Sequence, residues 1–193
     1  MSDPQSTRPG FSAFAGHRMI ARGSLPEVAL AVKEATEVDA ATTCLVFDDI
    51  TGTVVDLDLR GSRDEVRQRL GAGETSPEEA KPARGRPKLG VVAREVTLLP
   101  RHWEWLGAQP GGASQALRRL VDQARAADEG RSERRMASEA AYRFMAAMAG
   151  DLPGFEEASR ALFAGDVARL GTAMAGWPED VSRYVFRLWR TGN

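Results

Sequence analysis

The chain has 193 residues, of which 42% are hydrophobic and 27% are charged, and its formal net charge is −1 at neutral pH. This composition excludes a fibrous or wholly disordered chain and is typical of a globular protein with one or two small cores. No apolar run approaches the ~18 residues needed to cross a bilayer, and the start lacks a signal-peptide layout, so we expect a cytoplasmic protein with no membrane partner.

The beginning of the chain is expected to form a disordered tail, residues 1–10, followed by a small α+β unit, residues 11–70. Short apolar runs at residues 11–15 and 18–21 are predicted to pair as strands. Ser24 has the features of a helix N-cap, because proline and glutamate follow in the first turn and apolar residues then repeat at helical spacing. An amphipathic helix is therefore predicted after the two strands.

The same unit is predicted to end in a hairpin and a short helix. Residues 43–47 and 53–59 are rich in β-branched residues, and a turn sequence at residues 48–52 separates them. Residues 62–70 have the pattern of a short helix. The unit as a whole is therefore expected to place a few short strands beside two helices.

Residues 71–89 combine glycine, proline, glutamate and lysine without apolar periodicity, which is typical of a flexible linker. Positive charge is concentrated from this linker onward: residues 81–125 carry 9 basic and 3 acidic groups. The remaining segments are neutral or negative. Because a partner responds to local potential more than to total charge, the middle of the chain is the expected site for a polyanion.

Inside the linker, the sequence Arg-Gly-Arg-Pro at residues 84–87 resembles an AT-hook, a short motif that lies in the minor groove of A·T-rich DNA. The narrow groove attracts arginine, and glycine lets the backbone follow the side chains. The alternative is a solvated, charged linker that stays extended. The residues of this segment expected to contact DNA are Lys81, Arg84, Gly85, Arg86, Pro87 and Lys88.

Residues 90–127 are predicted to form a strand at 91–99, a short helix at 100–108 and a longer helix at 113–127 with Ser114 as its N-cap. This order resembles a ribbon-helix-helix module, in which strands from two chains pair and enter the major groove of DNA. The resemblance implies a homodimer in which Ala93, Glu95 and Thr97 face outward from the strand, and we expect Arg94 and Thr97 to contact DNA.

Helix-turn-helix geometry is the competing interpretation of this segment. The second helix would then present Gln115, Arg118 and Arg119 to base edges, where arginine pairs with guanine. Arginines on a helix surface can also be simply solvated. Trp103 and Trp105 are two residues apart and must point in different directions on a helix, so one of them is expected to be exposed at an interface.

Residues 128–193 are helical by pattern, with helices predicted at 132–149, 154–164, 166–174 and 178–190 and glycine or proline between them. The whole chain is therefore assigned to the α+β class: a small N-terminal α+β unit, a basic linker, and then one strand with a mainly α-helical C-terminal region.

Enzyme signatures are absent from the sequence, and we expect no catalytic residues, cofactor or metal. His17 and His102 are the two histidines, and neither lies near a nucleophile motif or a phosphate-binding loop. The alternative is a divalent-ion enzyme in which a hairpin gathers four carboxylates. These belong to Asp48, Asp49, Asp56 and Asp58.

Across its length the chain resembles an uncharacterised bacterial family of unknown function, through residues 13–18, 45–49, 55–61 and 84–105. That resemblance implies a bacterial protein and carries no activity. From the residues we expect a DNA-binding protein, a transcriptional regulator or nucleoid-associated factor that binds A·T-rich duplex as a homodimer. The alternative is a non-enzymatic interaction scaffold whose basic linker is only a tether.

Overall fold

The computed structural model describes residues 10–71 and 94–191, and these fall into two compact units. The first unit contains residues 10–71 and 131–191, and the second contains residues 94–130. Almost all of the predicted tail and linker therefore lies outside the described residues.

The first unit is built on a three-stranded antiparallel sheet. Its central strand is β1 (Phe11–Ala15), with β2 (Arg18–Gly23) on one side and β3 (Cys44–Asp48) on the other. The ladder between β1 and β3 is continuous, whereas the register between β1 and β2 shifts after Ala13. The predicted pairing of the first two strands is confirmed.

The predicted hairpin over residues 43–59 is much shorter than expected. Val54 forms an isolated bridge with Phe47, and the Val55 amide donates to the Val46 carbonyl at 2.8 Å. Beyond that point Val55, Leu57 and Leu59 pack against the core beneath the first helix. The apolar residues of this segment therefore pack into the core and do not form a strand. The prediction of a second strand at 53–59 is wrong, because only one β-bridge forms there.

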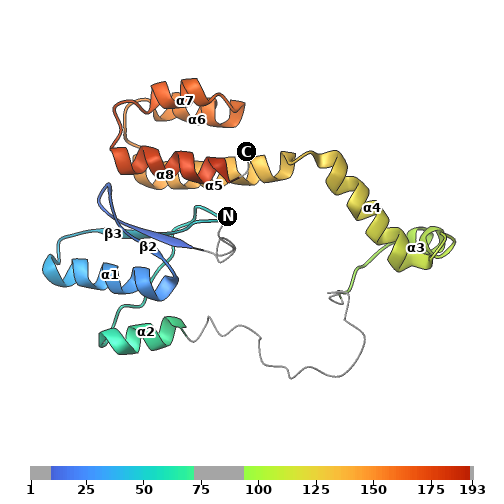
Figure 1. Ribbon diagram of the computed structural model, residues 1–193, viewed down its shortest axis with the longest axis horizontal. Helices are drawn as coiled ribbons and strands as arrows, with labels where there is room; N and C mark the ends of the chain where they lie inside the picture. Colours follow the sequence, from blue (N-terminus) through green and yellow to red (C-terminus); the bar gives the residue numbers. More distant parts are fainter. Residues whose placement is uncertain (1–9, 72–93, 192–193) are drawn as a thin grey trace, which may run out of the picture. The chain divides into compact units, whose positions relative to one another are not determined.

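The two faces of the sheet alternate because successive side chains of a strand point to opposite sides. Ala13 and Val46 pack with Val28 of α1 (Leu25–Val38) on one face. Phe14 and Phe47 lie in the core with α5 (Arg131–Ala149) and α8 (Glu179–Arg190) on the other. Figure 1 shows these helices covering opposite faces of the sheet.

Helix ends in the first unit follow local signals. Ser24 and Glu27 form a capping box at the start of α1, and Gly165 ends one helix with a φ of 71° that favours glycine. Asp166 caps the next helix by accepting from the Arg169 amide at 3.0 Å. The remaining helices of this unit are α2 (Arg63–Gly71), α6 (Phe155–Ala164) and α7 (Val167–Ala173).

The predicted C-terminal helices are confirmed within one or two residues, and so is the α+β class. No helix among residues 10–71 and 94–191 is both long enough and apolar enough to cross a membrane.

An aromatic cluster joins the N-terminal sheet to the C-terminal helices. The ring centroids of Phe47 and Phe144 are 4.8 Å apart, and those of Phe144 and Tyr184 are 4.5 Å apart. Phe14 completes the cluster at 5.2 Å from Phe144. Aromatic contacts at these separations add to the free energy of burial, so these distant parts of the sequence share one core.

The second unit is a helical hairpin of α3 (Pro100–Gly107) and α4 (Gly112–Asp128). Pro100 occupies the first turn of α3, as predicted. The prediction of Ser114 as N-cap of the second helix is wrong, because Gly111 and Gly112 adopt φ values of 82° and 73° and let the helix begin earlier.

Residues 94–99, the described part of the predicted strand at 91–99, form neither helix nor strand. A strand needs a neighbour to receive its backbone hydrogen bonds. In the ribbon-helix-helix interpretation that neighbouring strand belongs to a second chain. A single chain therefore provides no strand to which these residues can hydrogen-bond.

Candidate nucleic-acid interface

The predicted DNA-contacting residues divide into two groups. Arg94 and Thr97 are exposed in the segment before α3, and Arg118 and Arg119 are exposed on α4. No hydrogen bond or ion pair joins the two pairs within the described residues. The linker residues lie outside the described part of the chain: Lys81, Arg84, Gly85, Arg86, Pro87 and Lys88.

Arginines in the two units differ in whether they are paired. Most described arginines of the first unit form ion pairs with a carboxylate: Arg22, Arg60, Arg63, Arg67, Arg69, Arg135, Arg143, Arg160, Arg169, Arg183 and Arg187. Those between residues 94 and 125 form none with any described residue: Arg94, Arg101, Arg118, Arg119 and Arg125. Their guanidinium donors are therefore available to phosphate oxygens.

The positions of these arginines on α4 follow from the helical repeat of 3.6 residues. Arg118 and Arg125 are seven residues apart and share one face, while Arg119 lies on the neighbouring face. Val121 is three residues after Arg118 and four before Arg125, so it lies on their face, whereas Leu120 projects from a different side of the helix. The exposed surface of α4 therefore carries cationic and apolar side chains next to each other.

The described segment carries only part of the positive charge in the middle of the chain. Residues 94–125 contain five arginines and three acids, a net charge of +2, whereas residues 81–125 have a net charge of +6. The acids are Glu95, Glu104 and Asp122. Most of the excess charge thus belongs to the basic linker directly before this unit.

The second unit also exposes large apolar side chains. Among residues 94–130, Leu106 and Ala116 are the two buried hydrophobic residues, at 4% and 1% exposure. Trp103 and Trp105 are 42% and 52% exposed, so both tryptophans reach solvent where one was expected to do so. The exposed apolar residues of the second unit are Val96, Leu99, Trp103, Trp105, Leu120 and Val121.

Asp49 forms a polar network in the first unit that sequence reasoning missed. Its Oδ1 atom accepts hydrogen bonds of 2.7 Å from the hydroxyls of Ser12 and Tyr184. Its Oδ2 atom accepts from Arg22 Nε at 3.2 Å and also from Arg187. The turn after β3 is thereby tied to α8.

Two pKa shifts in this network have opposite directions. Burial acts to raise the pKa of Asp49, but the hydrogen bonds from Tyr184 and Ser12 and the charge of Arg187 outweigh it and hold that pKa below its usual value. Burial, followed by the hydrogen bond to Asp49, raises the pKa of Tyr184. Around neutral pH the carboxylate stays charged and the phenol stays neutral, which fits a fixed structural tie.

The four aspartates proposed as a metal cluster do not gather. Asp48 accepts from the backbone amides of its own turn, Asp49 belongs to the buried network, and Asp58 bonds to Arg60. Asp56 is exposed. In the described residues no three His, Cys, Asp or Glu side chains come close enough together to hold a metal ion.

A family model described as an uncharacterized protein conserved in bacteria, DUF2239, matches residues 10–189. The chain belongs to this family. The DUF2239 match spans both compact units and the linker between them, and it confirms the resemblance to an uncharacterised bacterial family. Neither the curated proteins nor the solved structures contain a match to the chain. The AT-hook-like and ribbon-helix-helix-like segments remain predictions from the residues.

Proposed function

We propose that this protein binds duplex DNA, with a preference for A·T-rich sequence, and acts in transcription regulation or chromosome organisation. The observation that carries the proposal is the absence of ion pairs at every described arginine between residues 94 and 125, next to the basic linker. In the first unit most arginines are neutralised by a carboxylate, so the unpaired cations are concentrated in one region. A polyanion is the partner that such a region attracts.

The two parts of the cationic region have different tasks. Arg84 and Arg86 enter the narrow minor groove, where the negative potential is deepest in A·T-rich DNA. Arg118 and Arg125 share a face of α4 and contact phosphates or base edges nearby. Phosphate contacts supply most of the affinity, and the minor-groove contacts supply the preference for A·T-rich duplex.

The binding unit is a homodimer formed through the second unit. Its hairpin buries two hydrophobic residues and leaves six large apolar ones exposed, so the fold is completed by covering them. A second copy of the same hairpin covers them by two-fold symmetry, because it offers the same apolar surface in return. Residues 91–99 then have a partner strand in the second copy.

Titration of fluorescent duplexes at fixed salt tests the proposal. Replacing Arg84 and Arg86 together by alanine is expected to weaken binding to A·T-rich duplex at least about tenfold, with a smaller effect on G·C-rich duplex. The matched control replaces Arg67 and Arg160, which are exposed but ion-paired to Asp64 and Glu157. Equal affinity of the double variant and wild type for A·T-rich duplex contradicts the minor-groove assignment.

A non-enzymatic scaffold is the second candidate function, and the exposure of both Trp103 and Trp105 favours it. Aromatic side chains are enriched at protein interfaces and often dominate their binding energy. A scaffold that uses these side chains for a different protein stays monomeric at high concentration and ignores DNA. Light scattering across a range of concentrations, together with the duplex titration, separates the two functions.

A further inference from the structure

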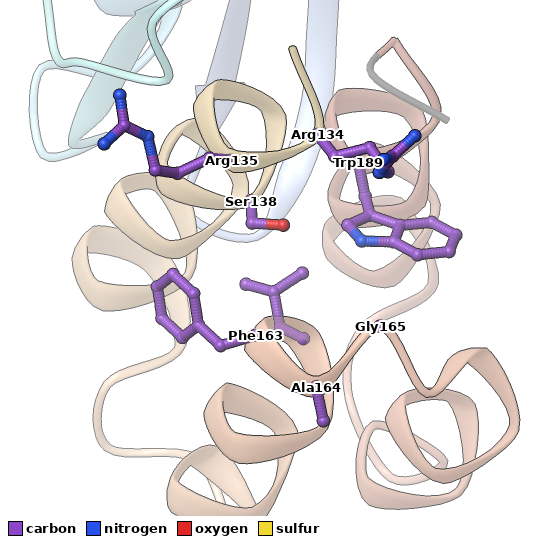
Figure 2. A pocket seen from close by; sticks show the side chains of 8 residues that line it. Arg134, Arg135, Ser138, Phe163, Ala164, Gly165 and Trp189 are labelled. Carbon is purple, nitrogen blue, oxygen red and sulfur yellow. The ribbon is translucent and has the colours of Figure 1, made fainter. Parts of the chain in front are cut away.

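A cavity of about 330 Å³ lies in the first unit between α5, the end of α6 and α8. Leu162 and Phe163 line it from α6, and Trp189 lines it from α8. Figure 2 shows Phe163 and Trp189 on two sides of this space. Leu162 and Trp189 are buried, whereas Phe163 is 56% exposed at the rim. The volume falls in the range of sites that hold a small organic molecule, and these side chains give the cavity apolar walls.

Ser138 supplies an unused polar group inside this cavity. Its residue is 8% exposed, and its hydroxyl makes no hydrogen bond with any described residue. Figure 2 shows the hydroxyl pointing from α5 into the space between the helices. The hydroxyl therefore lines the cavity as a hydrogen-bonding group that a bound molecule can use.

Arg134 supplies positive charge at the same cavity. It extends from α5 on the side of Trp189 (Figure 2), and it forms no ion pair with a described residue. Arg135, the other cationic lining residue, points away from the cavity and is paired with Glu139 at 3.9 Å. None of the lining residues is acidic, so an anion entering the cavity meets attraction without repulsion from its walls.

We propose that this cavity binds a small organic anion, whose carboxylate is held by Arg134 and Ser138 and whose aromatic or branched aliphatic body packs against Leu162, Phe163 and Trp189. A guanidinium and a hydroxyl together match the acceptors of a carboxylate. An inorganic anion leaves the apolar walls uncovered, so the apolar body contributes to affinity. Binding here does not depend on DNA binding by the second unit.

Calorimetric titration of the full chain with three carboxylates tests the proposal: phenylacetate, indole-3-acetate and 4-methylpentanoate. The best of them is expected to bind with a dissociation constant of about 1 mM or below, as its size allows. Phenylacetamide keeps the ring and removes the charge, and acetate keeps the charge and removes the body. Both are expected to bind at least about tenfold more weakly than the best carboxylate.

Variants locate the binding at this cavity. Arg134→Gln is expected to weaken the best carboxylate about tenfold and Ser138→Ala about fivefold, because each removes a donor to the carboxylate. Ser138→Ala also suits a helix, so it keeps the fold. The control is Arg160→Gln, which changes an ion-paired arginine of α6 outside the lining and should leave affinity unchanged.

Several results overturn the proposal. It fails if none of the three carboxylates binds below about 10 mM, a weaker affinity than such a site provides. It also fails if phenylacetamide or acetate binds as well as the best carboxylate, or if Arg134→Gln binds that carboxylate as wild type does. A thermal melt that matches wild type shows that each variant is folded.

Discussion

The two compact units differ in how far they satisfy their own side chains. The first unit contains every buried hydrophobic residue of the described chain except Leu106 and Ala116, and it pairs most of its arginines. The second unit exposes six large apolar residues within residues 94–130, whereas the first exposes seven over more than three times that length. None of the described arginines between residues 94 and 125 forms an ion pair with a described residue. The first unit therefore satisfies most of its side chains internally, and we propose that partners cover the exposed groups of the second.

From this difference we expect DNA binding and dimerisation to depend on the second unit. A large exposed apolar surface often marks an interaction site, and clustered positive charge attracts polyanions. The first unit holds its polar groups in fixed roles, such as the Asp49 network that ties the sheet to α8.

The largest effect on stability is expected from a core substitution in the first unit. Phe144→Ala removes a fully buried ring from the centre of the aromatic cluster and should lower the free energy of unfolding by about 3–5 kcal/mol. Urea denaturation, monitored by circular dichroism, measures this loss of stability. Phe163→Ala, at an exposed position, is the control and should cost far less. Similar destabilisation of both variants contradicts the assigned core.

Asp49→Asn is expected to lower the free energy of unfolding by about 2–4 kcal/mol at pH 7, because Arg187 and the buried hydroxyls lose their charged acceptor. Asp56→Asn, at an exposed aspartate, is the control and should change little. Denaturation at matched salt measures both. Equal stability of the two variants would show that the network contributes nothing.

The same network predicts a pH dependence. The folded-state pKa of Asp49 lies below its value of about 3.9 in an unfolded chain. Its contribution is therefore fully present above that unfolded value and is lost as pH falls through the folded pKa. The stability difference between wild type and Asp49→Asn should shrink in acid, and a difference that stays constant down to low pH contradicts the assignment.

The proposed dimer predicts that self-association depends on the second unit. Val121→Asp places a charge among its exposed apolar residues and should weaken dimerisation about a hundredfold, while the stability of the first unit stays unchanged. Analytical ultracentrifugation measures it, and Val167→Asp on an exposed apolar position of the first unit is the control. A wild-type chain that is monomeric at all concentrations removes the dimer from the account.

Much of the secondary structure could be predicted because its signals are local. Residues close together in the sequence determine the capping box at Ser24, the turn at Gly16 and the glycine breaks between the C-terminal helices. The start of α4 is predicted too late because Ser114 looks like a cap, while two glycines before it allow an earlier start. The strand at 53–59 is predicted too long because its apolar residues serve packing against α1.

The sequence carries no comparable local signal for the tertiary contacts. Phe14 and Tyr184 are 5.4 Å apart between ring centroids yet lie at opposite ends of the sequence. Asp49 looks like one of several turn aspartates, and only its burial shows that it bonds to Ser12 and Tyr184. The cavity at Ser138 likewise depends on how three helices pack. The exposed position of Arg118 and Arg119, by contrast, follows from helical periodicity.

The salt dependence of duplex binding by the intact chain tests the central claim most directly. The logarithm of the binding constant should fall linearly with the logarithm of salt concentration. Replacing Arg118 and Arg119 by alanine should reduce the slope by up to about 0.9 for each phosphate that the variant no longer neutralises. The control again replaces ion-paired Arg67 and Arg160 and should keep the wild-type slope. No duplex binding in dilute salt, or an identical slope in all three proteins, contradicts DNA binding through the second unit.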